Sequence, residues 1–178
     1  MTIQALVDDG RQVVIAGASE LHIHIRDQNG LESLQPDRVD ATMTALKDRL
    51  PGTLIGISTG AWIEKDDDRL LRYVTEWRAL PDYASVNLSE KNVPVLMERL
   101  HRSGIAIEAG LAQPDDAKRL LELGLDRLAL RLRAMSSQTL VGRSIIVTGA
   151  SSGIGKLNTR APLPRSVPVY PADSSIDR

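Results

Sequence analysis

Two histidines, His22 and His24, are the residues whose type and spacing most directly indicate chemistry. They alternate with Leu21, Ile23 and Ile25, which is the period-two pattern of a β-strand. Both imidazoles are therefore expected on one face of the strand, roughly 6.6 Å apart along it. Two imidazoles placed this way can bind one divalent metal ion from the same side. The alternative is that both are ordinary polar residues on a half-exposed strand face.

Further polar residues follow the ends of the predicted strands. Arg26 and Asp27 come directly after the histidines, where the strand is expected to open into a loop. Later strands are followed by Ser58, Thr59 and Gly60, then by Asn87 and Ser89, and then by Glu108. Active sites in parallel α/β sheets lie at the carboxyl ends of the strands, so we expect these residues to surround one site.

Each of these later residues also has a purely structural explanation. The hydroxyls of Ser58 and Thr59 could form a turn or cap a helix. Asn87 and Ser89 could cap the helix that follows them. Glu108 could be a solvated residue at a strand end.

The elements that would position these residues alternate along the chain. Helices are predicted at residues 2–16, 36–50, 66–80, 91–102 and 114–123, and strands at 21–25, 53–57, 84–88, 105–108 and 127–132. This alternation with short connections predicts an α/β fold with a parallel sheet and outer helices. The strands are short apolar runs, as expected when both faces are buried. An open doubly wound sheet and a barrel both fit the pattern.

Composition narrows the function classes. The 178 residues are enough for one domain with a core, and the formal net charge of −1 argues against binding nucleic acid through a broad positive surface. There is no cysteine, so a metal site would use histidine, carboxylate, carbonyl or water. No apolar run has the length of a membrane span, and the first five residues lack the features of a secretory signal. The cytoplasm is the expected location.

The sequence changes character after Ala134. Residues 144–155 predict a buried strand that runs into a glycine-rich turn, and Val147–Gly155 resembles the opening of a short-chain dehydrogenase/reductase, which binds NAD(P). No second strand, acidic residue or catalytic tyrosine segment of that family follows. Residues 159–178 contain four prolines and are expected to be disordered. The predicted domains are 1–134, 135–158 and 159–178.

Four segments together resemble the β-keto acid cleavage enzymes, of the 3-keto-5-aminohexanoate cleavage enzyme type. The matching segments are 22–30, 56–62, 84–90 and 107–111, and they follow the order and approximate spacing of that family. Each segment alone is a weak signal. The four together, each at a predicted strand end, make a specific match over about two thirds of the chain.

The resemblance implies a (β/α)8 barrel that binds zinc and uses acetyl-CoA as co-substrate. Such an enzyme converts a β-keto acid and acetyl-CoA into acetoacetate and a new acyl-CoA. His22 and His24 inherit the metal-binding role, while Ser58, Thr59 and Asp27 become catalytic candidates, with Asp27 orienting a metal-bound histidine. The substrate-binding candidates are Arg26, Gly60, Asn87, Ser89 and Glu108. The expected partners are the two small molecules and further copies of the chain in a homo-oligomer, with no nucleic acid or membrane.

The chain also departs from the pattern of that family. Residues 3–17 match its first barrel helix, so the first strand and its acidic residue are missing, and the match ends near Leu132. We therefore expect a partial TIM barrel, with about strands 2–5 or 6 of eight, and impaired activity. The third metal ligand is among the missing parts. The alternatives are an NAD(P)-dependent dehydrogenase fragment and a non-catalytic remnant.

Overall fold

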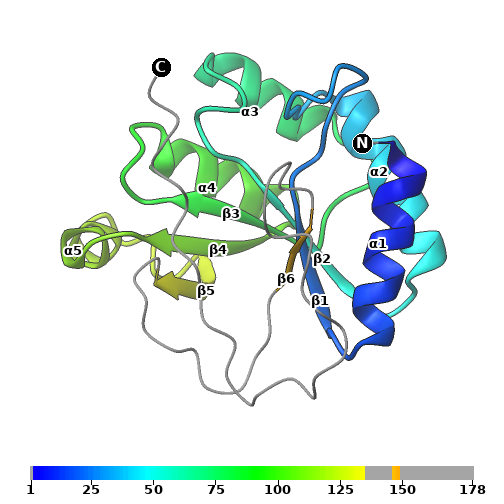
Figure 1. Cartoon of the computed structure of the whole chain (residues 1–178). Helices are drawn as coiled ribbons and strands as arrows, with labels where there is room; N and C mark the ends of the chain where they lie inside the picture. Colours follow the sequence, from blue (N-terminus) through cyan, green and yellow to red (C-terminus); the bar gives the residue numbers. More distant parts are fainter. Residues whose placement is uncertain (1, 135–145, 149–178) are drawn as a thin grey trace, which may run out of the picture.

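The computed structural model describes residues 2–134 and 146–148, which form five helices and six strands (Figure 1). The helices are α1 (Ile3–Ile15), α2 (Pro36–Arg49), α3 (Asp67–Glu76), α4 (Val93–Arg102) and α5 (Pro114–Glu122). The strands are β1 (Glu20–Ile23), β2 (Leu54–Ser58), β3 (Tyr83–Asn87), β4 (Ala106–Leu111), β5 (Ala129–Ala134) and β6 (Ile146–Thr148). The glycine-rich turn after residue 148 and the proline-rich tail lie outside the described residues. Within the described part, no helix has the length and apolar character needed to cross a membrane.

All described strands belong to one parallel sheet with the order β5-β4-β3-β2-β1-β6. Strands β1 to β5 lie side by side in chain order, and a helix connects each strand to the next. This confirms the predicted α/β class with a parallel sheet. Strand β6 pairs with β1 on the side away from β2, with Ile146 opposite Leu21.

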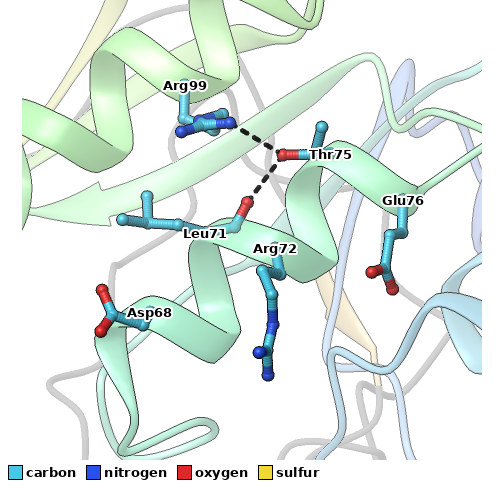
Figure 2. Close-up of a pocket in the computed structure, with 6 residues that line it drawn as sticks. All are labelled: Asp68, Leu71, Arg72, Thr75, Glu76 and Arg99. Atoms are coloured by element: carbon cyan, nitrogen blue, oxygen red, sulfur yellow. Dashed lines mark hydrogen bonds between the residues drawn. The ribbon is translucent and has the colours of Figure 1, made fainter.

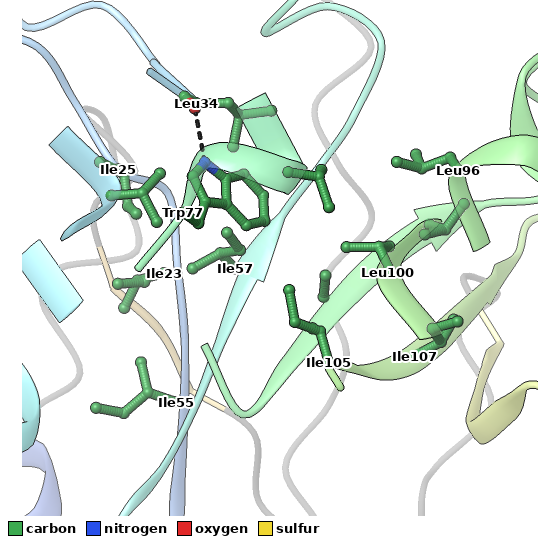
Figure 3. Close-up of a cluster of buried hydrophobic side chains, with 14 of the residues drawn as sticks. Ile23, Ile25, Leu34, Ile55, Ile57, Trp77, Leu96, Leu100, Ile105 and Ile107 are labelled. Carbon is green, nitrogen blue, oxygen red and sulfur yellow. Dashed lines mark hydrogen bonds between the residues drawn. The ribbon is translucent and has the colours of Figure 1, made fainter. Parts of the chain in front are cut away.

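One face of the sheet is apolar and packs against the helices, which form the outer layer (Figures 1 and 3). Leu21, Ile23, Ile55, Ile57 and Ile107 lie on this face, and all are completely buried. Helix α1 approaches closely because Gly10 has no side chain, and a Cβ there would lie 3.1 Å from Leu21 Cδ1. Burial of this face supplies the main hydrophobic stabilisation of the fold.

The opposite face is polar, although the sequence predicted strands that are apolar on both faces. His22, Gly56 and Tyr83 occupy one row of paired residues, and Ser58, Ser85 and Glu108 occupy the next. The prediction that both faces of the strands are apolar was wrong. Ile, Val and Ala residues on one face alternate along each strand with these polar residues on the other, and strands this short contain too few residues for the alternation to stand out.

The sheet is strongly curved, with the polar face on the inside. His22 Nδ1 lies 3.7 Å from Glu108 Oε2, although β2 and β3 separate the two strands. In a flat sheet three strand spacings would put β1 and β4 about 14 Å apart. The contact therefore requires curvature that brings side chains from distant strands together.

Several element boundaries differ from the prediction, and packing explains two of them. Strand β1 ends at Ile23, because the chain leaves the sheet to form an antiparallel bridge between Arg26 and Glu32. Helix α3 ends at Glu76 instead of continuing to residue 80. The next residue, Trp77, is extended and buried, and its indole N–H donates to the carbonyl of Leu34 at 3.1 Å (Figure 3).

Candidate functional site

The two histidine rings lie close together at the carboxyl end of β1. Their ring centres are 5.5 Å apart and the ring planes meet at 63°. His22 is buried, whereas the His24 side chain is about one-fifth exposed. His22 lies on the strand itself and His24 immediately follows it.

A carboxylate lies beside Nδ1 of each histidine. Glu108 Oε2 is 3.7 Å from His22 Nδ1, and Glu32 Oε1 is 3.1 Å from His24 Nδ1. Metal-binding histidines commonly give one ring N–H to such a carboxylate, which leaves the other nitrogen to bind the metal. The hydrogen-bonded pair of His24 and Glu32 therefore favours Nε2 as the ligating atom of His24, whereas the 3.7 Å contact of His22 with Glu108 is longer than a hydrogen bond.

The spacing of the rings is compatible with one shared ion. Two imidazoles bound to the same tetrahedral metal have ring centres roughly 5 Å apart, given metal–nitrogen distances of about 2.0–2.1 Å. The observed 5.5 Å agrees with this value. Within residues 2–134 and 146–148, however, no group of three histidine, aspartate or glutamate side chains is arranged to hold a metal. The histidines thus fit as two ligands of an incomplete set.

Glu32 is a site residue that the sequence analysis missed. Its Oε1 contacts His24 and lies 3.7 Å from Arg26 Nη2, while its Oε2 accepts a hydrogen bond from the Trp62 indole at 2.8 Å. The hydrogen bond with His24 is the main reason why the pKa of Glu32 is lowered, against the opposing effect of burial. The available signal was the Asn29-Gly30 turn, which reverses the chain and returns Glu32 to Arg26.

Asp27 does not contact the histidines, so its predicted orienting role is corrected. Its Oδ1 accepts the backbone N–H groups of Asn29 at 2.8 Å and Leu31 at 3.0 Å. Burial would raise the pKa of Asp27, but these hydrogen bonds from Leu31 and Asn29 lower it overall. The carboxylate stabilises the loop, because an aspartate at a loop start readily bonds to the backbone N–H two residues on.

Arg26 lies beside His24 and is tied to the same loop. Its Nη1 donates to the carbonyl of Gly30 at 2.7 Å, and its side chain is largely buried. The guanidinium therefore supports both the loop and the carboxylate of Glu32.

The segment after β2 brings three predicted residues to the same end of the sheet. Ser58 is buried, and its hydroxyl makes no hydrogen bond within the described part of the chain. The Thr59 hydroxyl donates to the carbonyl of Ser85 at 2.8 Å, so it links β2 to β3 and neither forms a local turn nor caps a helix. At Gly60 a Cβ would lie 2.2 Å from the ring of Trp62, which covers this position and is 55% exposed.

At the end of β3 and just after it, the predicted residues Asn87 and Ser89 lie in different environments. Asn87 ends the strand and donates through Nδ2 to Glu90 Oε1 at 2.9 Å, whereas Ser89 is exposed. Neither residue caps α4, whose N-cap is Asn92. Glu90, which the sequence analysis also missed, additionally accepts the backbone N–H of Ala61 at 3.1 Å and so connects the loops after β2 and β3.

One surface hollow lies away from these residues, and a second touches two of them. A groove of about 480 Å³ lies between α3 and α4 and is shown in Figure 2. There the Thr75 hydroxyl accepts from Arg99 and donates to the carbonyl of Leu71. A crevice of only about 10 Å³ touches His24 and Arg26, beside α1 and α2. That space suffices for about one water molecule.

Comparisons with known proteins identify a family that matches this sequence. The sequence model of the family described as "beta-keto acid cleavage enzyme" matches residues 1–123. A curated protein, the 3-keto-5-aminohexanoate cleavage enzyme of Acetoanaerobium sticklandii, is 29% identical over 73 residues, which cover 41% of this chain and 27% of that protein. The match therefore spans about a quarter of the length of that relative.

One solved structure gives a weaker likeness. The 3-dehydroquinate dehydratase from Geobacillus kaustophilus HTA426 aligns with a TM-score of 0.46 and 11% identity, over 76% of this chain and 84% of that chain.

Proposed function

Since the chain belongs to the β-keto acid cleavage enzyme family, we propose that it cleaves a β-keto acid with the help of acetyl-CoA. In this reaction the acyl part of the β-keto acid moves to CoA, and its remaining carboxymethyl part joins the acetyl group to give acetoacetate. The observation that carries the proposal is the pair of neighbouring histidines at the carboxyl end of β1, each with a carboxylate near Nδ1.

His22 and His24 would hold a zinc ion through their Nε2 atoms. Neutral imidazoles suit zinc, and the remaining ligands would come from the substrate and from outside the described residues. Bound zinc would act as a Lewis acid toward an oxygen of the β-keto acid. Glu32 would fix the orientation of the His24 ring, and Glu108 would lie beside His22.

Ser58 is the best candidate for a direct contact with substrate. Its hydroxyl is at the end of β2 and is not used by the described scaffold, so it can donate to a carboxylate or carbonyl oxygen. Thr59 and Asn87 are engaged with Ser85 and Glu90, so we assign them to shaping the pocket. Arg26 would hold the carboxylate of Glu32 in place beside His24. Gly60 and Ser89 would lie at the border of the pocket.

The larger assembly is part of the same proposal. The curvature between β1 and β4 supports a (β/α)8 barrel of which these strands form a section. We also propose a homo-oligomer in the cytoplasm. The predicted segments 135–158 and 159–178 fall largely outside the described residues.

The test uses the full chain with zinc, acetyl-CoA and a short β-keto acid. We expect stoichiometric zinc by metal analysis and formation of acetoacetate. Changing His22 or His24 to alanine should reduce turnover by at least about a hundredfold, and changing both should abolish zinc binding. His101→Ala, on the exposed last turn of α4, is the matched control and should retain both properties.

Two outcomes would contradict the proposal. If the double variant still bound one equivalent of zinc, the ion would not be held by these histidines. If the zinc-loaded wild-type chain produced no acetoacetate from any short β-keto acid, the proposed reaction would be wrong for this polypeptide.

A further inference from the structure

Three side chains of the site, those of His24, Trp62 and Arg26, lie around the carboxylate of Glu32. One carboxylate oxygen contacts the His24 imidazole at 3.1 Å, and the other accepts the Trp62 indole N–H at 2.8 Å. The Arg26 guanidinium lies 3.7 Å from the first oxygen. The carboxylate therefore joins the loop after β1 to the segment after β2.

The loop that carries Glu32 is built to hold it in a fixed position. An antiparallel bridge pairs Arg26 with Glu32, and the backbone N–H of Ser33 donates to the carbonyl of Ile25 at 2.9 Å. Across the turn, the backbone N–H of Asp27 donates to the carbonyl of Leu31 at 2.8 Å. A carboxylate on such a constrained loop is pre-organised for its partner.

A fixed carboxylate at Nδ1 determines which nitrogen of His24 carries the hydrogen. An ionised carboxylate only accepts hydrogen bonds, so the contact requires a hydrogen on Nδ1. In the neutral imidazole Nε2 then has a lone pair and can bind a metal. A neutral imidazole without such a partner prefers the opposite form, with its hydrogen on Nε2.

The second oxygen of Glu32 extends this effect to Trp62. The indole covers Gly60, where a Cβ would lie 2.2 Å from the ring, and it is 55% exposed. The chain has two tryptophans, and the other, Trp77, is buried against Leu34. A change at His24 should therefore reach the environment of one exposed indole through a single carboxylate.

We propose that Glu32 is a positioning residue that sets the Nδ1–H form of His24 and couples this histidine to Trp62. The proposal deepens the proposed function and rests on it only where zinc is concerned. It assigns Glu32 to orienting a ligand and not to contact with the reacting atoms.

The direct test is an NMR measurement of the imidazole nitrogens in the ¹⁵N-labelled full chain at a pH where histidine is neutral. In the wild type we expect His24 to carry its hydrogen on Nδ1. In Glu32→Ala the signal should change to the Nε2–H form, while His22 and His101 keep their wild-type patterns. Glu32→Gln, whose amide oxygen can still accept from Nδ1, should preserve the wild-type form. The control Glu76→Ala, on the exposed side of α3, should change none of these signals.

Zinc titration of the same variants provides the second measurement. We expect Glu32→Ala to weaken binding about 10–100-fold, the usual effect of removing a carboxylate behind a metal-binding histidine. Zinc should change tryptophan fluorescence in the wild type, and this change should be lost in Trp62→Phe and in Glu32→Ala.

The outcomes separate this proposal from the proposed function. An identical His24 tautomer in the wild type and in folded Glu32→Ala would overturn it, as would unchanged zinc affinity in that variant. An equal fluorescence response in the wild type and Trp62→Phe would refute the coupling. If the wild type bound no zinc, the proposed function would fail, and the NMR result would still decide whether Glu32 sets the tautomer.

Discussion

Gly56 shapes the polar face of the sheet because it leaves room for a large ring from the next strand. Tyr83 of β3 occupies the space above Gly56 of β2, and its hydroxyl donates to the carbonyl of Leu21 in β1 at 3.2 Å. The same ring lies 6.2 Å from that of His22. Because Gly56 has no side chain, the Tyr83 side chain can extend from β3 across β2 to β1 beside the candidate site.

Gly56→Ala is therefore expected to destabilise the protein. The new Cβ would lie 2.1 Å from two atoms of the Tyr83 ring, so either the ring or the strand must move. Overpacking of this kind costs about 1–3 kcal/mol in the free energy of unfolding, which urea denaturation would measure. In a Tyr83→Ala background the same substitution should cost much less, because the clash is gone. Equal costs in the two backgrounds would show that the ring is not the obstacle.

At this scale the sequence predicted the histidines, and it predicted Glu108 as a substrate-binding residue, but it indicated neither Glu108 nor Glu32 as a neighbour of a histidine. His22 and His24 stand out because they alternate with apolar residues within five positions. Glu32 approaches His24 only after the loop at the Asn29-Gly30 turn closes, and Glu108 approaches His22 only because the sheet curves, which no local pattern shows. Asp27 lies directly after the histidines in sequence, yet its carboxylate accepts the backbone N–H groups of Asn29 and Leu31.

At the scale of elements, helix and strand order was predictable, whereas several boundaries were not. Apolar spacing marks α2 and α4 well, since Val39, Met43 and Leu46, like Leu96 and Leu100, recur at helical intervals and are completely buried. The end of α3 depends on the burial of Trp77 against Leu34, a contact across 43 residues that sequence spacing does not show. Its beginning, by contrast, is local, because Asp66 is its N-cap.

The Asp66 cap leads to a pH-dependent prediction. Its carboxylate accepts the backbone N–H of Arg69 at 2.9 Å, and this hydrogen bond is the main reason why its pKa lies below the usual 3.8. A lowered folded-state pKa means that the carboxylate stabilises the fold above pH 3.8 and loses this effect as pH falls through the folded value. Asp66→Ala should lower the thermal midpoint by about 2–4 °C at neutral pH.

Thermal unfolding between pH 7 and pH 3 would check this prediction. The difference between the wild type and Asp66→Ala should stay constant down to about pH 4 and then shrink. Asp126→Ala, at an exposed turn position, is the control and should show little difference at any pH. A difference that grew on acidification would contradict the assignment of the cap.

At the scale of the whole molecule, the described part of the chain forms a curved sheet with helices outside (Figure 1). Polar residues lie on the inner face of that sheet. The alternation of helices and strands made the parallel sheet predictable. The curvature was not, because it is visible only in contacts such as that between His22 and Glu108. The place of β6 was equally hidden, since its partner β1 precedes it by more than a hundred residues and no pattern specifies that pairing.

The pairing of β6 with β1 gives a prediction about the edge of the sheet beside the histidines. Backbone pairing places Val147 opposite His22, so the amide groups on that side of β1 are covered by β6. A proline at residue 147 has no N–H and disrupts strand pairing, so Val147→Pro should uncover this edge. Hydrogen exchange of the full chain should then show faster exchange in Leu21–Ile23 and unchanged exchange in β3 and β4.

The matched control is Val167→Pro, at a position outside the described residues, which should leave exchange in β1 at the wild-type rate. An uncovered edge also offers a template for pairing with other chains, so Val147→Pro should associate more readily at high concentration in sedimentation experiments. If exchange in Leu21–Ile23 were the same in the wild type and Val147→Pro, β6 would not be the neighbour of β1. Another segment of the chain or another copy of the protein would then have to cover β1. Exchange in β1 that slows as protein concentration rises would indicate another copy, and exchange independent of concentration would indicate another segment.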